Sequence, residues 1–156
     1  MTGRSPGCAS RVSTPPAVRR ILDAERGGAL TVAPSKLVAS RQRYEVASGV
    51  LVTEMRAPGG VLRVTDALTI RKGADLAEDA SASRSELIRS ARVLDGQVEL
   101  LIEVAPWRRA VRGEGGEGMV IRDPDGDIHV WGSQPLQGLR TLQVLEAGEE
   151  FHLVLR

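Results

Sequence analysis

Two tryptophans, Trp107 and Trp131, are the residues whose chemistry most suggests a ligand. The face of an exposed indole ring packs on the CH groups of a pyranose, so the pair could form a sugar-stacking platform. Large aromatic side chains also fill the edge of a β-sandwich or an interface between domains. We favour packing for both tryptophans and keep sugar stacking as the alternative.

The remaining candidates for catalysis or metal binding lack the spacing that such chemistry needs. Glu99 and Glu103 alternate along one expected strand, whereas glycosidase acids lie opposed across a cleft. His129 and His152 show no HxH or HxxxH spacing for a metal, and Cys8 has no partner motif. We therefore predict no catalytic residue, no metal ligand and no cofactor.

Two glycine-containing segments resemble ligand loops without matching them. In residues 123–127, Asp-Pro-Asp-Gly-Asp, glycine is fourth instead of sixth, and Gln134 occupies the twelfth position where a calcium loop has Glu. Residues 113–118 carry two glutamates and precede an expected strand, whereas a phosphate loop precedes a helix. We predict a β-turn for the first segment and a flexible loop for the second.

Composition excludes several classes of partner. The net charge is +1, from 21 basic and 20 acidic residues, and aromatic residues are only 3% of the chain. A nucleic-acid partner is therefore not expected, because there is neither a basic stripe nor a set of stacking side chains. No apolar run approaches the ~20 residues of a membrane span. The single cysteine excludes an intrachain disulfide and suggests a reducing, cytoplasmic location.

Alternating apolar residues and turn signals predict strands along most of the chain. Residues 30–33 form one such strand. Four hairpins are expected after it: residues 50–57 with 61–70 across Pro58-Gly59-Gly60, residues 86–94 with 97–105 across Asp95-Gly96, residues 119–122 with 127–131, and residues 141–145 with 150–155 across Ala147-Gly148. A short helix is predicted over residues 17–26, ended by Gly27-Gly28.

These elements predict an all-β fold, an antiparallel β-sandwich with one short N-terminal helix. Residues 1–12 are expected to be a flexible tail, and residues 13–156 a single domain.

An ordered series of motifs resembles the N-terminal, trehalase-like domain of bacterial glycoside hydrolase family 15, which includes trehalase-like and glucoamylase-like enzymes. The series runs through Arg43-Tyr44, Val50-Leu51-Val52-Thr53, Gly59-Gly60-Val61-Leu62-Arg63-Val64-Thr65-Asp66, Glu86-Leu87-Ile88-Arg89, Leu94-Asp95-Gly96-Gln97-Val98-Glu99-Leu100, Ala105-Pro106 and Leu145-Glu146-Ala147-Gly148-Glu149. Upstream, Leu22-Asp23-Ala24-Glu25-Arg26-Gly27-Gly28 resembles another segment of that family.

The resemblance implies a super-sandwich type of β-sandwich that packs against a separate (α/α)6 barrel, in cis or in trans. In that family the barrel carries the general acid and base and hydrolyses α-glucosidic bonds with inversion. The family's opening hairpin is not found before Arg11, and Glu45-Val46-Ala47-Ser48-Gly49 replaces its Pro-Asp-Thr-Asn turn. The resemblance therefore assigns no functional residue to this chain.

The resemblance implies a non-catalytic domain, present here as a fragment or a truncated gene product that lacks the barrel. Two alternatives remain. The chain could be a standalone module that binds an α-glucan, trehalose or a protein. It could also be a degenerate, inactive remnant.

Overall fold

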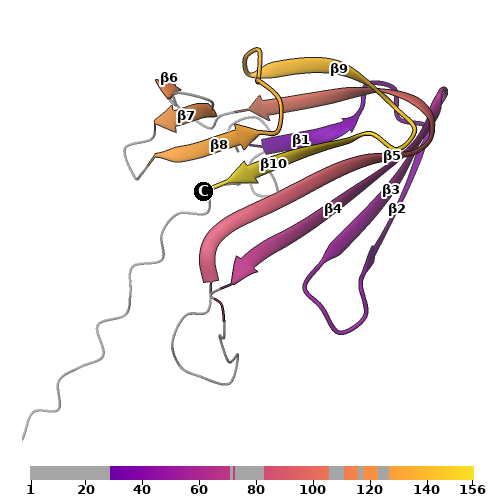
Figure 1. Ribbon diagram of the computed structural model, residues 1–156, viewed down its shortest axis with the longest axis horizontal. Coiled ribbons are helices and arrows are strands. Elements are labelled where there is room, and N and C mark those ends of the chain that lie inside the picture. The colour runs from indigo at the N-terminus through magenta and orange to yellow at the C-terminus, as the bar shows by residue number, and fades with distance from the viewer. Residues whose placement is uncertain (1–28, 71, 73–82, 106–110, 116–117, 123–126) are drawn as a thin grey trace, which may run out of the picture.

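The computed structural model describes residues 29–70, 72, 83–105, 111–115, 118–122 and 127–156. These residues form strands and connecting turns without a helix, and the predicted all-β class is confirmed (Figure 1). The predicted helix over residues 17–26 and the predicted tail over residues 1–12 lie outside the described residues. The described part holds no helix long and apolar enough to cross a membrane. The strands are β1 (Ala29–Pro34), β2 (Ala39–Tyr44), β3 (Leu51–Ala57), β4 (Gly60–Ile70), β5 (Ser83–Ala105), β6 (Val111–Gly115), β7 (Gly118–Arg122), β8 (Ile128–Gly132), β9 (Arg140–Glu146) and β10 (Glu150–Leu155).

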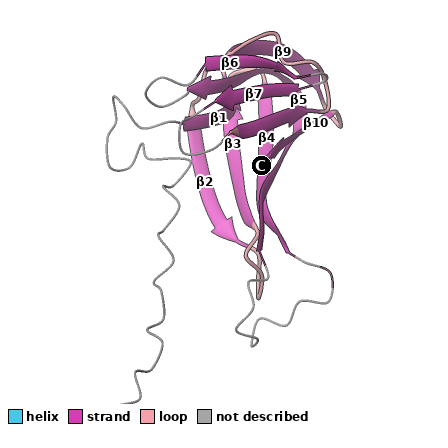
Figure 2. Ribbon diagram, turned by 90° about the vertical axis from the view of Figure 1, so that its left-hand side faces the viewer, coloured by secondary structure: helices cyan, strands magenta, loops and turns pink. Residues whose placement is uncertain are grey.

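The strands form two antiparallel sheets that share β5. The large sheet has the order β2-β3-β4-β5-β10-β8-β7-β6, and the small sheet has β5 between β1 and β9. Buried residues of both sheets form one hydrophobic cluster, so the sheets pack face to face as a sandwich. Figure 2 shows the molecule from the side, with β1, β7 and β9 running across the direction of β2, β3 and β4.

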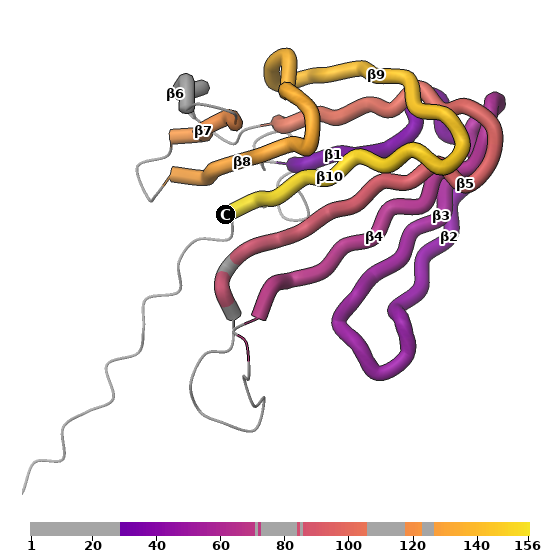
Figure 3. The backbone as a smooth tube through the Cα atoms, viewed as in Figure 1, coloured from indigo at the N-terminus to yellow at the C-terminus, as the bar shows by residue number. Residues whose placement is uncertain are grey.

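The long strand β5 passes from one sheet to the other at a corner. Its first part, up to Asp95, pairs with β4 and β10, and its second part, from Gln97, pairs with β9 and β1. Gly96 lies between them with a φ of 68°, a conformation that glycine adopts without strain. The hairpin predicted across Asp95-Gly96 is therefore wrong, because the two halves of β5 turn back at this corner without pairing with each other and belong to different sheets (Figure 3).

The corner is closed by the turn between β3 and β4. Gly60 pairs with Gly96, and the amide of Gln97 donates to the carbonyl of Gly59 at 2.9 Å. A Cβ on Gly96 would lie 2.1 Å from the Gly59 oxygen, so the two backbones can approach only because this position is glycine.

The other predicted hairpins had different outcomes. The pairs β3–β4 and β7–β8 are confirmed, and so is the strand expected over residues 30–33, which lies in β1. The pairing predicted between residues 141–145 and 150–155 is wrong, because β9 joins the small sheet and β10 the large sheet. The loop predicted over residues 113–118 is wrong at both ends, since residues 113–115 belong to β6 and Gly118 begins β7.

The core lies between the two sheets, on what we call the inner face of each. In β5 the alternation predicted from the sequence is confirmed, with one face buried and Glu99 and Glu103 on the opposite, outer face. Phe151 of β10 is the largest fully buried side chain. The core residues are Val32, Leu62, Val64, Ala91, Val93, Val98, Leu100, Ile102, Val104, Met119, Ile121, Val130, Leu145, Phe151 and Leu153.

Candidate functional site

The outer face of the large sheet carries the polar and aromatic groups that could meet a ligand. Side chains alternate between the two faces of a strand, so the register fixes which residues share this face. Two groups stand out: the arginine cluster, made of Arg41, Arg43, Glu54 and Arg63 on β2, β3 and β4, and the aromatic platform, made of His129 and Trp131 on β8.

The arginine cluster forms because the register places Arg41, Glu54 and Arg63 in one row, with Arg43 two residues along β2 on the same face. Arg41 pairs with Glu54 across β2 and β3, and Glu54 pairs with Arg63 across β3 and β4. Arg41 Nε donates to Glu54 Oε2 at 2.8 Å, and Arg63 Nη2 donates to Oε1 at 2.9 Å. Arg43 Nη1 lies 3.6 Å from the same Oε1 atom. One carboxylate thus accepts contacts from three guanidinium groups.

Hydrogen bonds from Arg41 and Arg63 lower the pKa of Glu54 from 4.5 to about 2. Glu54 is therefore ionised at neutral pH and acts only as an acceptor. A glycosidase general acid needs a raised pKa, so Glu54 cannot take that role. Arg43 Nη2 also lies 3.5 Å from Glu45 Oε1, so three guanidinium groups face two carboxylates. The remaining positive charge is available to an external carboxylate or phosphate.

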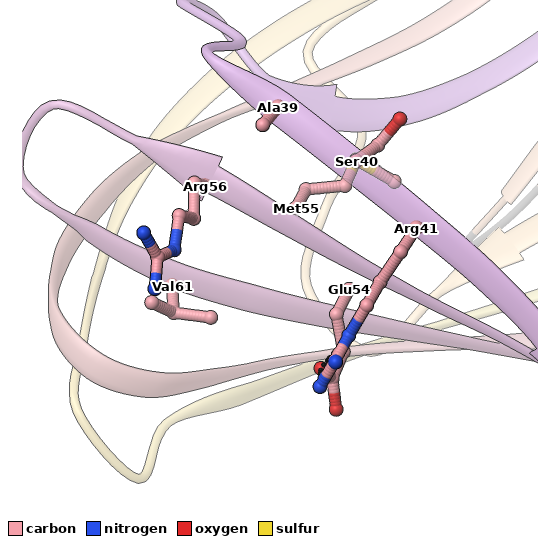
Figure 4. A pocket seen from close by; sticks show the side chains of 7 residues that line it. All are labelled: Ala39, Ser40, Arg41, Glu54, Met55, Arg56 and Val61. Carbon is pink, nitrogen blue, oxygen red and sulfur yellow. Dashed lines mark hydrogen bonds and ion pairs between the residues drawn. The ribbon is translucent and has the colours of Figure 1, made fainter.

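A hollow of about 400 Å³ lies beside the cluster, at the edge of the large sheet formed by β2. Figure 4 shows Arg41 lying along Glu54, with Arg56 beside Val61. The lining mixes charged and apolar groups and comprises Ala39, Ser40, Arg41, Glu54, Met55, Arg56 and Val61. An anionic group could enter this hollow and reach Arg41 or Arg56.

The aromatic platform lies on β8. The rings of His129 and Trp131, two residues apart, stack with centroids 5.4 Å apart and planes inclined by 14°. Trp131 is 37% exposed. Gly118 of β7 pairs with Trp131, and a Cβ at Gly118 would lie 2.7 Å from Trp131 Cδ1. Glycine at this position therefore lets the indole lie close to the neighbouring strand.

Polar groups of β5 and β10 border the platform. Val154 of β10 pairs with Trp131, and the residues on either side of it on the same face are His152 and Arg156. His152 Nε2 lies 4.0 Å from Glu150, and Arg156 Nη1 lies 3.6 Å from Glu86. A half-exposed indole bordered by hydrogen-bonding groups can hold the apolar face of a sugar ring while its hydroxyls find partners.

The structure brings together only some of the residues singled out in the sequence. Trp131 lies at the surface, whereas Trp107 lies outside the described residues, so the two-tryptophan platform stays a prediction. His129 and His152 lie on different strands, as expected. Within the described ranges, no three His, Cys, Asp or Glu side chains gather to hold a metal ion.

Sequence reasoning missed the arginine cluster. Its members lie on three strands, and only the alternating Arg41 and Arg43 gave a local signal. The fold and this face define an antiparallel β-sandwich with a charged and aromatic outer surface. No protein-family model, no curated protein and no solved structure matches the chain.

Proposed function

We propose that this chain is the non-catalytic N-terminal sandwich domain of a trehalase-like or glucoamylase-like glycoside hydrolase of family 15. Its role is to support a catalytic (α/α)6 barrel and to shape the rim of that barrel's cleft. The observation that carries the proposal is the convergence, at one corner of the fold, of three motifs by which the sequence resembles the family.

The three motifs meet around Gly96. The first contains Gly59 and Gly60, and the second contains Gly96 and Gln97, which contact them through backbone atoms. The third lies between β9 and β10, where Gly148 N donates to the carbonyl of Val93 at 2.9 Å. Val93 N in turn donates to the carbonyl of Glu149 at 3.0 Å. Backbone contacts among three segments that are far apart in the sequence therefore stabilise the same corner of the fold.

A further pair of motifs meets inside the sandwich. Asp66 ends the Gly-Gly-Val-Leu-Arg-Val-Thr-Asp motif, and Arg89 ends the Glu-Leu-Ile-Arg motif. Arg89 Nε donates to Asp66 Oδ1 at 2.5 Å, and both side chains are mostly buried. The motif residues therefore hold strands together, which suits a supporting domain whose partner barrel supplies the general acid and base.

The coding sequence directly after Arg156 gives the first test. We expect it to encode a helical barrel, and the joined protein to release glucose from trehalose or an α-glucan. The 156-residue chain alone should release none, and the barrel alone should melt at a lower temperature than the joined protein. A native protein that ends at Arg156 and binds no barrel, or glucose release by this chain alone, would contradict the proposal.

A second candidate function, a carbohydrate-binding module, is favoured by the half-exposed Trp131. Titration with trehalose, maltose and longer α-glucans, followed by tryptophan fluorescence, tests it. Binding through the platform should change the emission of the wild-type chain and should be lost in Trp131→Ala. His152→Ala is a useful companion, because it removes a bordering polar group and keeps the indole. No response at millimolar sugar excludes this function.

We place the domain in the cytoplasm, since Cys8 is the only cysteine and the fold needs no disulfide. Fractionation of cells that express the tagged native protein tests this location, and recovery from an extracellular fraction would contradict it.

A further inference from the structure

The strand β2 forms an edge of the large sheet. Among the described strands it pairs with β3 alone, so its other side carries backbone N–H and C=O groups that point out of the sheet. All its residues, Ala39–Tyr44, are exposed, and none is a proline. The pairing with β3 runs through the whole strand without a register shift. Its edge therefore has the regular geometry with which a further strand can pair.

The side chains along this edge determine which strand can be added. The outer face of β2 carries Ala39, Arg41 and Arg43. The outer side chains of an added strand would lie opposite these residues, with Cβ atoms about 4.5–5.5 Å away. Opposite charges stabilise such cross-strand pairs and like charges destabilise them. An added strand should therefore carry acidic side chains on its outer face.

Both arginines of β2 can bind a second carboxylate. Arg41 uses Nε and Nη2 for Glu54, and its side chain is still 78% exposed. Arg43 has longer contacts, 3.5 Å to Glu45 and 3.6 Å to Glu54, and is 48% exposed. A guanidinium group has five N–H donors, so both arginines retain donors for an acceptor at the edge of the sheet.

The hollow beside β2 adds a third positive group. Arg56 of β3 pairs with Ala39 and lines this hollow together with Arg41 (Figure 4). Because the Ala39 side chain is small, a carboxylate in the hollow opposite Ala39 can reach Arg56. The three outer-face positions of β2 thus each offer an arginine to an acidic side chain on an added strand.

A second copy of this chain does not fit the edge. Antiparallel pairing of two β2 strands would place arginines of the two copies opposite each other on the outer face. Charged side chains on an edge strand are one way in which sheets avoid such edge-to-edge association. The charges that repel a copy attract a strand of opposite charge.

We propose that β2 binds an extended acidic segment of a partner protein, which adds a strand to the large sheet. The segment carries Glu or Asp at three alternate positions, opposite Ala39, Arg41 and Arg43. Its backbone pairs with the free side of β2, and its intervening side chains lie on the inner face beside Gln42 and Tyr44. This inference goes beyond the proposed function, because it requires neither the barrel nor a sugar.

Calorimetric titration of the whole 156-residue chain with short peptides tests the proposal. The probe is the acetylated and amidated peptide Val-Glu-Val-Glu-Val-Glu-Val, and the control peptide has Lys in place of each Glu. We expect the wild-type chain to bind the acidic peptide and not the basic one. Absence of binding to the acidic peptide at millimolar concentration, or equal binding of both peptides, overturns the proposal.

A charge reversal on β2 locates the binding. Arg41→Glu with Arg43→Glu should bind the acidic peptide at least about tenfold more weakly than the wild-type chain and should bind the basic peptide instead. The gain of the basic peptide also shows that the variant is folded. The matched control is Arg92→Glu with Arg122→Glu, which makes the same change in net charge at exposed outer-face positions of β5 and β7. Equal losses of affinity in the two variants overturn the proposal.

Hydrogen exchange followed by NMR distinguishes strand addition from attraction by charge alone. In the free chain, the β2 amides that do not donate to β3 should exchange rapidly, and the acidic peptide should slow them at least about tenfold. Peptide binding without this slowing overturns strand addition. Slow exchange of the same amides before peptide is added, in a monomer or in a dimer detected by light scattering, shows that the edge is already occupied and also overturns the proposal.

Discussion

The covered and uncovered ends of the inner face have the same sequence pattern and different environments. Along β4 apolar residues occupy alternate positions from Leu62 to Ile70, interrupted by Asp66. The half near the corner lies under the small sheet and forms the core, while the half beyond Asp66 has no described strand opposite it. Alternation decides which way a side chain faces, and a second layer decides whether it is buried.

Removal of Phe151 from the covered end should have the largest effect. Phe151→Ala should lower the free energy of unfolding by about 3–5 kcal/mol, because it empties the largest fully buried position. Urea denaturation at neutral pH measures the loss. His152→Ala, one residue along on the outer face, is the control and should change it by less than about 0.5 kcal/mol. Similar losses for the two variants would contradict the assignment of faces.

The corner that separates the sheets gives the second prediction. Gly96→Ala should cost about 1–3 kcal/mol, because alanine at a φ of 68° is strained and its Cβ would meet the Gly59 oxygen. Gly148 has a φ of 90° and open space around it, so Gly148→Ala isolates the cost of the backbone conformation.

Gly49→Ala is the reference for this series, since Gly49 has neither a positive φ nor a close neighbour. Unfolding free energies should decrease from Gly49→Ala through Gly148→Ala to Gly96→Ala. A Gly96→Ala variant as stable as Gly49→Ala would show that the corner tolerates a side chain.

The outer face should give the smallest effect, visible as a pH dependence. The pKa of Glu54 is about 2 in the folded chain, below its ordinary value of 4.5. The stability that ionised Glu54 contributes is therefore complete above pH 4.5 and is lost as the pH falls from 4.5 toward 2. Arg41 is largely exposed, so solvent and salt weaken the contribution.

Denaturation of the wild-type chain and Glu54→Gln between pH 6 and pH 2.5 measures this dependence. The difference in stability between the two proteins should shrink as the pH falls, and it should be smaller in about 1 M salt at every pH. A difference that stays constant with pH would show that the arginine contacts do not favour the ionised form.

The sequence predicted which residues face the core far better than which strands pair. Val98, Leu100, Ile102 and Val104 are buried as their alternation indicates, because period-two alternation is a local property. The hairpin predicted at Asp95-Gly96 was wrong, because a glycine with a positive φ occurs at a corner between two sheets as well as in a hairpin turn. Nothing local in Ala147-Gly148 distinguishes a turn within one sheet from a connection between two.

The sequence likewise predicted one part of the candidate site and missed the other. Trp131 was found from its residue type alone, whereas its stacking on His129 depends on their positions two residues apart on β8. The arginine cluster could not be predicted, because Arg41, Glu54 and Arg63 meet only through the register of three strands. Such a cluster can be predicted only when the register between neighbouring strands is known.

The place of β10 has a consequence for synthesis of the chain on the ribosome. Although β10 follows the other nine described strands in sequence, it lies inside the large sheet, between β5 and β8. The edge of β5 that β10 pairs with thus waits for residues 150–155 to emerge, at about 5–20 residues per second. Nascent chains arrested before this point should expose that edge of β5, and this is the stage at which a chaperone would be needed most.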